Sequence, residues 1–95
     1  MRSYKELKKE ATYKFLETPG HGYLIVPKEE IINDIKNGIK YTEYSSVVGN
    51  KVYLEEDVDT TTFMEAHNLT NDDLEIKYGN FKHDIYPPIS SLEIT

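Results

Sequence analysis

Three carboxylates lie at alternate positions in the run Tyr53-Leu54-Glu55-Glu56-Asp57-Val58-Asp59, and carboxylates at this spacing can hold a cation. Side chains alternate along an extended strand, so Glu55, Asp57 and Asp59 are expected on one side of the chain. Hard divalent ions such as Mg²⁺ and Ca²⁺ prefer oxygen ligands of this kind. The run lacks the Gly and the distal Glu of an EF-hand loop, however. We therefore expect solvated carboxylates here, with Asp59 capping a helix, and assign no metal ligand and no cofactor.

The triplet Glu75-Ile76-Lys77 adds an acid-x-Lys pattern on an expected strand. Metal-dependent nucleases place acidic residues on the ion and use a lysine to orient water or to stabilise charge. Such triplets are common in charged proteins, and a nuclease also needs a basic groove for its substrate. A divalent-metal hydrolase or nuclease built on Glu55, Asp57 and Asp59 is therefore kept as an alternative, and no catalytic residue is assigned.

A histidine lies between two glycines in Gly20-His21-Gly22. Bare backbone lets a ligand approach, so these three residues are the candidates for a ligand contact, while the favoured interpretation is that His21 packs or caps the turn. No serine or cysteine partner can be assigned to the imidazole, and turn geometry alone explains the glycines. Of the other histidines, His67 is expected at a helix C-terminus and His83 on a strand that faces solvent.

The acidic residues are concentrated in one stretch of the chain. Between Val52 and Ile76 there are eight acidic residues and no Lys or Arg, although the whole chain carries a net charge of only -6. A negative surface disfavours direct binding to nucleic acid and favours a basic surface on another protein. The residues expected to bind such a partner are Glu55, Glu56, Asp57, Asp59, Asp72, Asp73 and Glu75, with Tyr53 as an aromatic anchor.

The composition is that of a small folded protein. At 95 residues with 38% hydrophobic side chains, the chain is expected to form one domain over 1–95. It has no cysteine, which excludes disulfides and thiol chemistry and agrees with a reducing compartment. No segment approaches the roughly 20 apolar residues of a membrane helix, and the N-terminus lacks the apolar region of a signal peptide. A cytoplasmic protein without a membrane partner is expected.

Turn residues divide the chain into short elements. Pro19-Gly20 predicts a type II turn between two strands, and Gly49-Asn50 and Gly79-Asn80 predict two further hairpins. These give an α+β fold: a small antiparallel sheet of three hairpin-like pairs, with two short helices on one face. The helices are expected at 28–37, ended by Gly38, and at 59–67. We also expect a strand over 39–45, strands over 74–78 and 81–86, a loosely attached N-terminal segment over 1–11 and a C-terminal tail over 89–95.

Three motifs together resemble a known family. They are Pro19-Gly20-His21-Gly22-Tyr23-Leu24-Ile25-Val26-Pro27, then Tyr44-Ser45, then Gly49-Asn50-Lys51-Val52-Tyr53-Leu54-Glu55-Glu56-Asp57-Val58-Asp59 with Phe63. The chain resembles a small uncharacterised family carried on bacteriophages, plasmids and other mobile elements, over about residues 15–86. Members often have a Cys where this chain has Val58, so no role of that thiol transfers. The resemblance implies an accessory protein in a bacterial cytosol and implies no particular activity.

The charge pattern and the resemblance lead to one principal expectation and two alternatives. The principal one is a non-enzymatic accessory protein whose acidic face binds a basic surface of a host or mobile-element protein, as an inhibitor of host defence that mimics nucleic acid would do. The first alternative is the metal-dependent enzyme described above. The second is a structural homodimer formed by sheet-edge pairing through the C-terminal hairpin.

Overall fold

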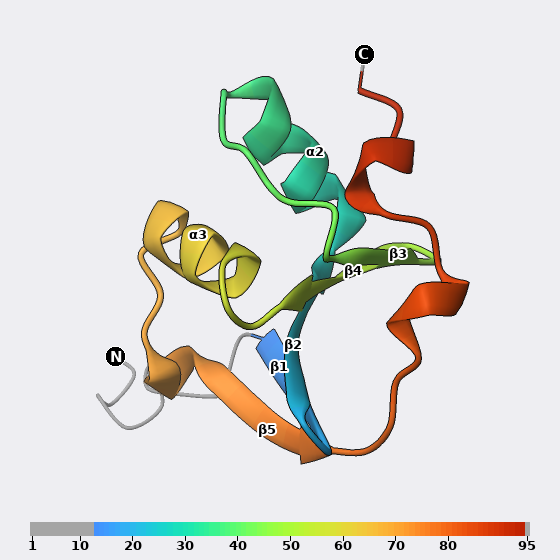
Figure 1. Ribbon diagram of the computed structural model, residues 1–95. Coiled ribbons are helices and arrows are strands. Elements are labelled where there is room, and N and C mark those ends of the chain that lie inside the picture. The colour runs from blue at the N-terminus through green and yellow to red at the C-terminus, as the bar shows by residue number, and fades with distance from the viewer. Residues whose placement is uncertain (1–12, 95) are drawn as a thin grey trace, which may run out of the picture.

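The computed structural model describes residues 13–94, in which five strands form one sheet and two helices pack against it (Figure 1). The expected segment 1–11 lies outside the described residues. The expected α+β class, with a small sheet and two short helices, is confirmed. The strands are β1 (Tyr13–Thr18), β2 (His21–Pro27), β3 (Ser46–Val48), β4 (Lys51–Glu55) and β5 (Leu74–Tyr78), and the helices are α2 (Lys28–Lys36) and α3 (Asp59–Ala66).

Two of the predicted hairpins are present. β1 and β2 pair antiparallel across Pro19-Gly20, and Gly20 has φ of +92°, as position three of a type II turn requires. β3 and β4 pair antiparallel across Gly49-Asn50, with Gly49 at φ of +62°. Since β2 also pairs antiparallel with β4, four strands form the order β3-β4-β2-β1.

The third predicted hairpin does not form. β5 pairs parallel with β1 instead, and the sheet is mixed, in the order β3-β4-β2-β1-β5. The amide N–H of Gly79 continues this pairing by donating to the carbonyl of Glu17 at 3.0 Å. The chain then leaves the sheet, because Phe81 stacks on Tyr53 with ring centroids 4.4 Å apart and contacts Tyr23 edge-on at 4.9 Å. Residues 81–86 are therefore held by aromatic packing across the sheet face and are not a strand.

The core lies between the sheet and the helices. Alternation along the strands directs Leu24 and Val26 of β2 and Leu54 of β4 to the helical side, where all three are fully buried. Ile31 of α2 and Phe63 of α3 complete the core from the helical side and are also fully buried. Figure 1 shows both helices on this side of the sheet.

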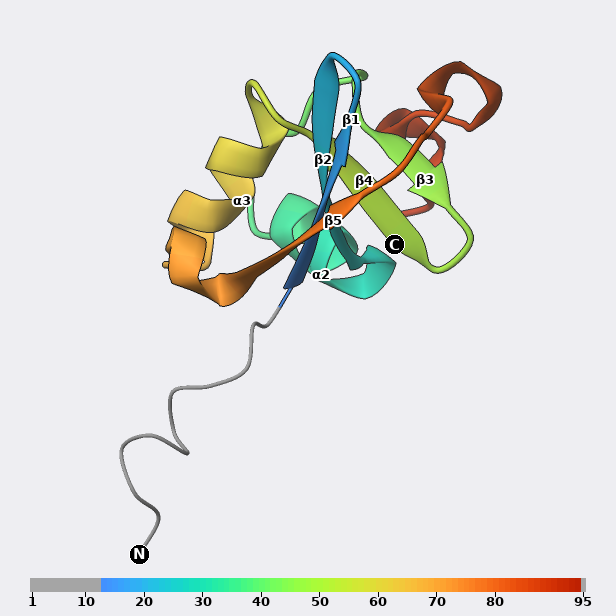
Figure 2. The same cartoon turned by 90° about the horizontal axis from the view of Figure 1, so that it is seen from below.

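The segment after β5 wraps around the β3 edge of the sheet. The N–H of Val47 donates to the carbonyl of Pro87 at 2.8 Å, and Ser46 forms a bridge with Pro88. Ile89 then enters the core, with 6% of its surface exposed. The first residue of the C-terminal tail expected over 89–95 is therefore part of the core. Seen from below, β5 lies in front of β1 and β2, at the opposite end of the sheet from β3 (Figure 2).

No helix within residues 13–94 has the length and apolar character needed to cross a membrane.

Candidate functional site

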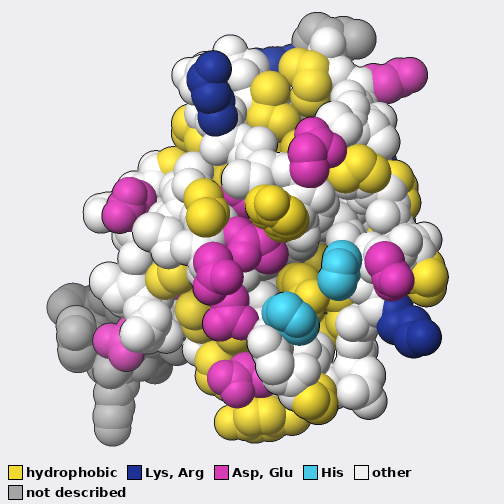
Figure 3. Space-filling model, in the orientation of Figure 1, with side chains coloured by type: hydrophobic (Ala, Val, Ile, Leu, Met, Phe, Trp, Pro, Cys, Tyr) yellow, Lys and Arg dark blue, Asp and Glu magenta, His cyan; other side chains and the backbone are white. Residues whose placement is uncertain are grey.

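A hollow of about 280 Å³ lies at one end of the sheet, where four separate segments meet. Figure 3 shows histidine side chains next to a run of acidic side chains on this side of the molecule. The hollow thus joins the candidate ligand position His21 to part of the predicted acidic face. Its lining residues are His21, Tyr23, Tyr44, Glu55, Asp57, Val58 and His83.

Strand pairing brings the histidine and the acidic run together. His21 is the first residue of β2, directly after the Pro19-Gly20 turn, and Glu55 is the last residue of β4. Tyr23 pairs with Glu55 across the two strands, so both strand ends open on the same hollow. The ring of His83, from the 3-10 turn His83–Ile85, comes within 6.4 Å of the His21 ring, centroid to centroid. The expectation that His83 lies on a strand is therefore wrong.

The two glycines beside His21 have different roles. Gly20 occupies the turn, where its positive φ favours glycine. A Cβ on Gly22 would meet the ring of Phe15 at 2.5 Å and a carboxylate oxygen of Glu56 at 3.0 Å, so Gly22 permits close packing. Of the three candidate ligand positions, His21 lines the hollow, and the two glycines shape the chain around it.

Asp59 does not lie on the acidic surface. It is fully buried, and its carboxylate accepts hydrogen bonds from the backbone N–H of Thr42 at 2.9 Å, the Thr42 hydroxyl at 2.7 Å and the Ser45 hydroxyl at 2.5 Å. It is also not the side-chain cap predicted for α3. Its donors all belong to 42–45, where the strand expected over 39–45 is wrong and the chain forms a loop. The backbone N–H of Thr42 donates to the carboxylate and not to a neighbouring strand.

Glu55 supplies the cap that had been expected of Asp59. Its carboxylate accepts the backbone N–H groups of Asp57 at 2.8 Å, Val58 at 2.6 Å and Asp59 at 2.8 Å. A negative charge at the first turn of α3 also interacts favourably with the helix dipole. The expected alternation of Glu55, Asp57 and Asp59 along one strand is therefore wrong, since β4 ends at Glu55 and the chain turns into the helix.

The exposed part of the site is aromatic and apolar as well as acidic. Tyr44 is 73% exposed and Val58 is 50% exposed, and both line the hollow beside Asp57. Tyr44 is held in place from both sides, because its neighbours in the loop, Thr42 and Ser45, are fixed to Asp59. Tyr53, the predicted aromatic anchor, is instead half-buried beneath Phe81.

The predicted acidic face is divided into two groups. Glu55, Glu56 and Asp57 lie where β2 begins, which is beside the end of β1. Asp72, Asp73 and Glu75 lie beside the beginning of β1, because Leu74 pairs with Tyr13 in the parallel register. Within the second group, Asp73 forms a capping box with Thr70, and Glu75 forms an ion pair with Lys77 at 3.1 Å. The first group is the one that borders the hollow.

The electrostatic potential in the hollow is negative. Burial raises the pKa of the Tyr23 phenol, and the carboxylates of Glu56 and Glu55 raise it further by opposing a second negative charge. Among residues 13–94, no ion pair joins Glu55, Glu56 or Asp57 to a lysine. A cation that enters the hollow would therefore meet carboxylates that no lysine of residues 13–94 pairs with.

The carboxylates are poorly placed for a divalent metal. No group of three or more His, Asp or Glu side chains in residues 13–94 has the geometry of a metal site. The oxygens of Glu55 and Asp59 are already used as hydrogen-bond acceptors for the chain itself. Two of the three carboxylates required by the metal-dependent alternative are thus committed to holding α3 and the 42–45 loop.

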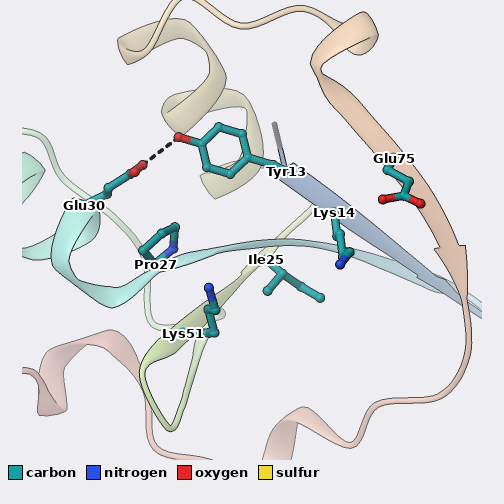
Figure 4. Close-up of a pocket in the computed structure, with 7 residues that line it drawn as sticks. All are labelled: Tyr13, Lys14, Ile25, Pro27, Glu30, Lys51 and Glu75. Atoms are coloured by element: carbon teal, nitrogen blue, oxygen red, sulfur yellow. Dashed lines mark hydrogen bonds between the residues drawn. The ribbon is translucent and has the colours of Figure 1, made fainter. Parts of the chain in front are cut away.

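A second hollow, of about 400 Å³, lies near the other end of β2 (Figure 4). Lys14, Lys51 and Ile25 line one part of it, and the hydrogen-bonded pair Tyr13 and Glu30 lines another, with the phenol donating at 2.8 Å. Its two lysines are balanced by Glu30 and Glu75, so the lining does not select a ligand of either charge.

Sequence reasoning missed Tyr44, Val58, His83 and Tyr23 as members of the site. Tyr44 lacked a usable signal, because 39–45 alternates enough to predict a strand and the loop that presents Tyr44 depends on the buried Asp59. His83 had none, because its position depends on packing of Phe81 across the sheet. No protein-family model matches the chain, and neither a curated protein nor a solved structure similar to it was found.

Proposed function

We propose that this chain is a non-enzymatic binding protein whose hollow around His21, Tyr44 and Asp57 receives a basic side chain of a partner protein. The observation that carries the proposal is the exposure of Tyr44, 73%, and Val58, 50%, directly beside Asp57. Aromatic residues that combine an apolar face with a polar tip are typical energetic centres of protein interfaces. A lysine or arginine fits this environment, because the Tyr44 ring and the carboxylate both attract a cation.

The separation of the acidic residues into two groups favours a small contact with the partner protein over an extended one. A protein that mimics nucleic acid needs carboxylates in an extended row, whereas here the two groups lie beside opposite ends of β1. The hollow matches the size of one or two side chains and not of a duplex backbone. We therefore propose a partner that inserts a basic side chain, in keeping with an accessory protein of a phage or plasmid that acts on a host protein.

The hydrogen bonds that Glu55 and Asp59 already accept from the chain itself favour a binding protein over a metal-dependent hydrolase. An enzyme built on Glu55, Asp57 and Asp59 needs all three carboxylates free for the ion. Asp59 is fully buried against Thr42 and Ser45. In our proposal Asp59 acts as a positioning residue, since it fixes the loop that presents Tyr44.

The test compares two variants of the hollow with two controls. Tyr44→Ala and Asp57→Lys alter the hollow, whereas Ile94→Ala and Asp72→Lys remove an exposed apolar side chain and reverse an exposed charge elsewhere. The tagged proteins are used to capture partners from a bacterial lysate at low and high salt, and each captured protein is then purified for affinity measurement. We expect a basic partner whose binding weakens at least about tenfold in both hollow variants and much less in the controls.

Two results would contradict the proposal. One is a partner whose affinity is unaffected by Tyr44→Ala and Asp57→Lys. The other is an equal loss of binding in Asp72→Lys, which would mean that total negative charge, and not the hollow, governs binding.

A further inference from the structure

The outer edge of β5 is an open strand with a self-complementary sequence. The β3 edge is closed by the contact of Val47 with Pro87, but no strand within residues 13–94 pairs with the outer side of β5. Two apolar side chains of β5 are exposed, Ile76 at 46% and Tyr78 at 79%. Open edges with apolar side chains are templates for pairing with another strand.

The backbone alternation of β5 determines which residues can pair outward. Gly79 donates its N–H to Glu17 of β1, so the odd-numbered residues of β5 direct their N–H and C=O groups toward β1. The same groups of Leu74, Ile76 and Tyr78 therefore point outward. A second β5 strand must form its hydrogen bonds with these three residues.

Charge then selects one register among those that the backbone allows. With a two-fold axis at Ile76, an antiparallel partner places Glu75 opposite Lys77 on both sides of the axis. Shifting the axis to Glu75 would place Glu75 opposite its own copy, and shifting it to Lys77 would do the same for Lys77. Like charges directly opposite each other destabilise a strand pair, whereas a Glu opposite a Lys stabilises it.

The apolar side chains fit the same register. Ile76 meets its own copy at the axis, and Tyr78 lies opposite Leu74 of the other chain. These three residues share the sheet face that also bears Phe15, which pairs with Ile76. Glu75 and Lys77, whose side chains are 49% and 51% exposed and lie 3.1 Å apart within one chain, share the other face and need only small movements to pair across the axis.

We propose that the occupant of this edge is a second copy of the chain, paired antiparallel through β5 about Ile76, so that two five-stranded sheets join into one continuous sheet. A closed two-fold pairing of this kind uses up both open edges, which prevents further growth into filaments. No residue of β5 lines the hollow around His21 and Tyr44, so the dimer presents two separate copies of the proposed binding site. The inference therefore goes beyond the proposed function and does not depend on it.

The first test changes the charges of Glu75 and Lys77 and measures dimerisation. Sedimentation of the full chain from micromolar to millimolar concentration is expected to show a monomer–dimer equilibrium. Lys77→Glu places two Glu–Glu pairs in the interface and is expected to raise the dimer dissociation constant about tenfold or more, and the double change Glu75→Lys with Lys77→Glu should restore it because each pair is again Glu opposite Lys. Ile76→Lys, at the axis, should abolish the dimer, and thermal unfolding of each variant verifies that the monomer fold is kept.

The second test determines by NMR which residues of the two β5 strands lie opposite each other. In a mixture of isotope-labelled and unlabelled chains, an intermolecular NOE is expected between the Hα of Glu75 and the Hα of Lys77, since this pair lacks direct hydrogen bonds and its backbones come closest. The amides of Ile76 and Tyr78 should exchange more slowly as the protein concentration rises.

Three results would overturn the proposal. A monomer throughout the concentration range would do so, as would a dimer that is unaffected by Lys77→Glu and Ile76→Lys. Slow exchange of the Ile76 and Tyr78 amides in a monomer at every concentration would assign the edge to a segment of the same chain.

Discussion

Asp59 illustrates how one buried carboxylate organises both the fold and the candidate site. Its oxygens accept three kinds of donor from Thr42 and Ser45, and Ser45 in turn accepts the backbone N–H of Glu55 at 2.9 Å. The loop that carries Tyr44 is thus connected to the start of α3 and to the end of β4. A buried charge of this kind is tolerated only because every oxygen is hydrogen-bonded.

We predict that Asp59→Asn destabilises the protein by about 3 kcal/mol, because an amide presents N–H groups to donors that need an acceptor. Asp57→Asn is the matched control: it makes the same change two residues earlier at an exposed position and should alter the free energy of unfolding by less than about 0.5 kcal/mol. Urea unfolding of both variants measures the difference. Equal stability of the two variants would mean that the Asp59 network does not hold the loop.

At the scale of elements, the sequence predicted local structure well and long-range pairing poorly. The turns at Pro19-Gly20 and Gly49-Asn50 and both helices follow from local chemistry, since Gly at positive φ and helix end signals act within a few residues. The pairing of β5 with β1 joins residues about sixty positions apart, and Gly79-Asn80 carries no signal of it. For the same reason His21 could be identified as a candidate, whereas its neighbours in the hollow, Tyr44 and His83, depended on the tertiary structure.

Helix α2 is fixed to the rest of the molecule by two partly buried tyrosines. The phenol of Tyr13 donates to Glu30 at 2.8 Å, and that of Tyr41 donates to Asp34 at 2.7 Å. Asp34 also contacts the imidazole of His67 at the end of α3, at 2.8 Å. Burial, followed by the hydrogen bond to a carboxylate, raises the pKa of each tyrosine above its ordinary value of 10.0.

This arrangement predicts a loss of stability at alkaline pH. Above pH 10 the unfolded chain ionises Tyr13 and Tyr41, whereas the folded chain keeps them protonated, so unfolding releases protons and stability falls as the pH rises. Tyr41→Phe should lower the slope of unfolding free energy against pH in this range by up to about 1.4 kcal/mol per pH unit. The exposed Tyr44→Phe is the control and should leave the slope unchanged. Equal slopes in Tyr41→Phe and the parent protein would contradict the assignment.

At the scale of the whole molecule, the two edges of the sheet differ, because the chain covers the β3 edge and no strand within residues 13–94 pairs with the outer side of β5. The segment after β5 crosses the face opposite the helices through Phe81, follows the β3 edge at Pro87 and Pro88, and ends in the core at Ile89. The path was not visible in the sequence, where Pro87-Pro88 indicated only the end of a strand. The β3 edge is consequently protected by the chain itself, and β5 is left as the edge available for association.

The C-terminal segment should therefore contribute to global stability. Ile89→Ala removes a side chain that is only 6% exposed and packs in the core, and we predict a loss of about 2–4 kcal/mol in the free energy of unfolding. Ile94→Ala, the same change at a residue that is 37% exposed, should cost less than about 0.5 kcal/mol. Hydrogen exchange adds a local measurement: the amide of Val47, which donates to Pro87, should exchange faster in Ile89→Ala than in Ile94→Ala because the edge is released. If both variants unfold at the same denaturant concentration and the Val47 amide exchanges equally, residues 87–92 do not belong to the cooperative fold.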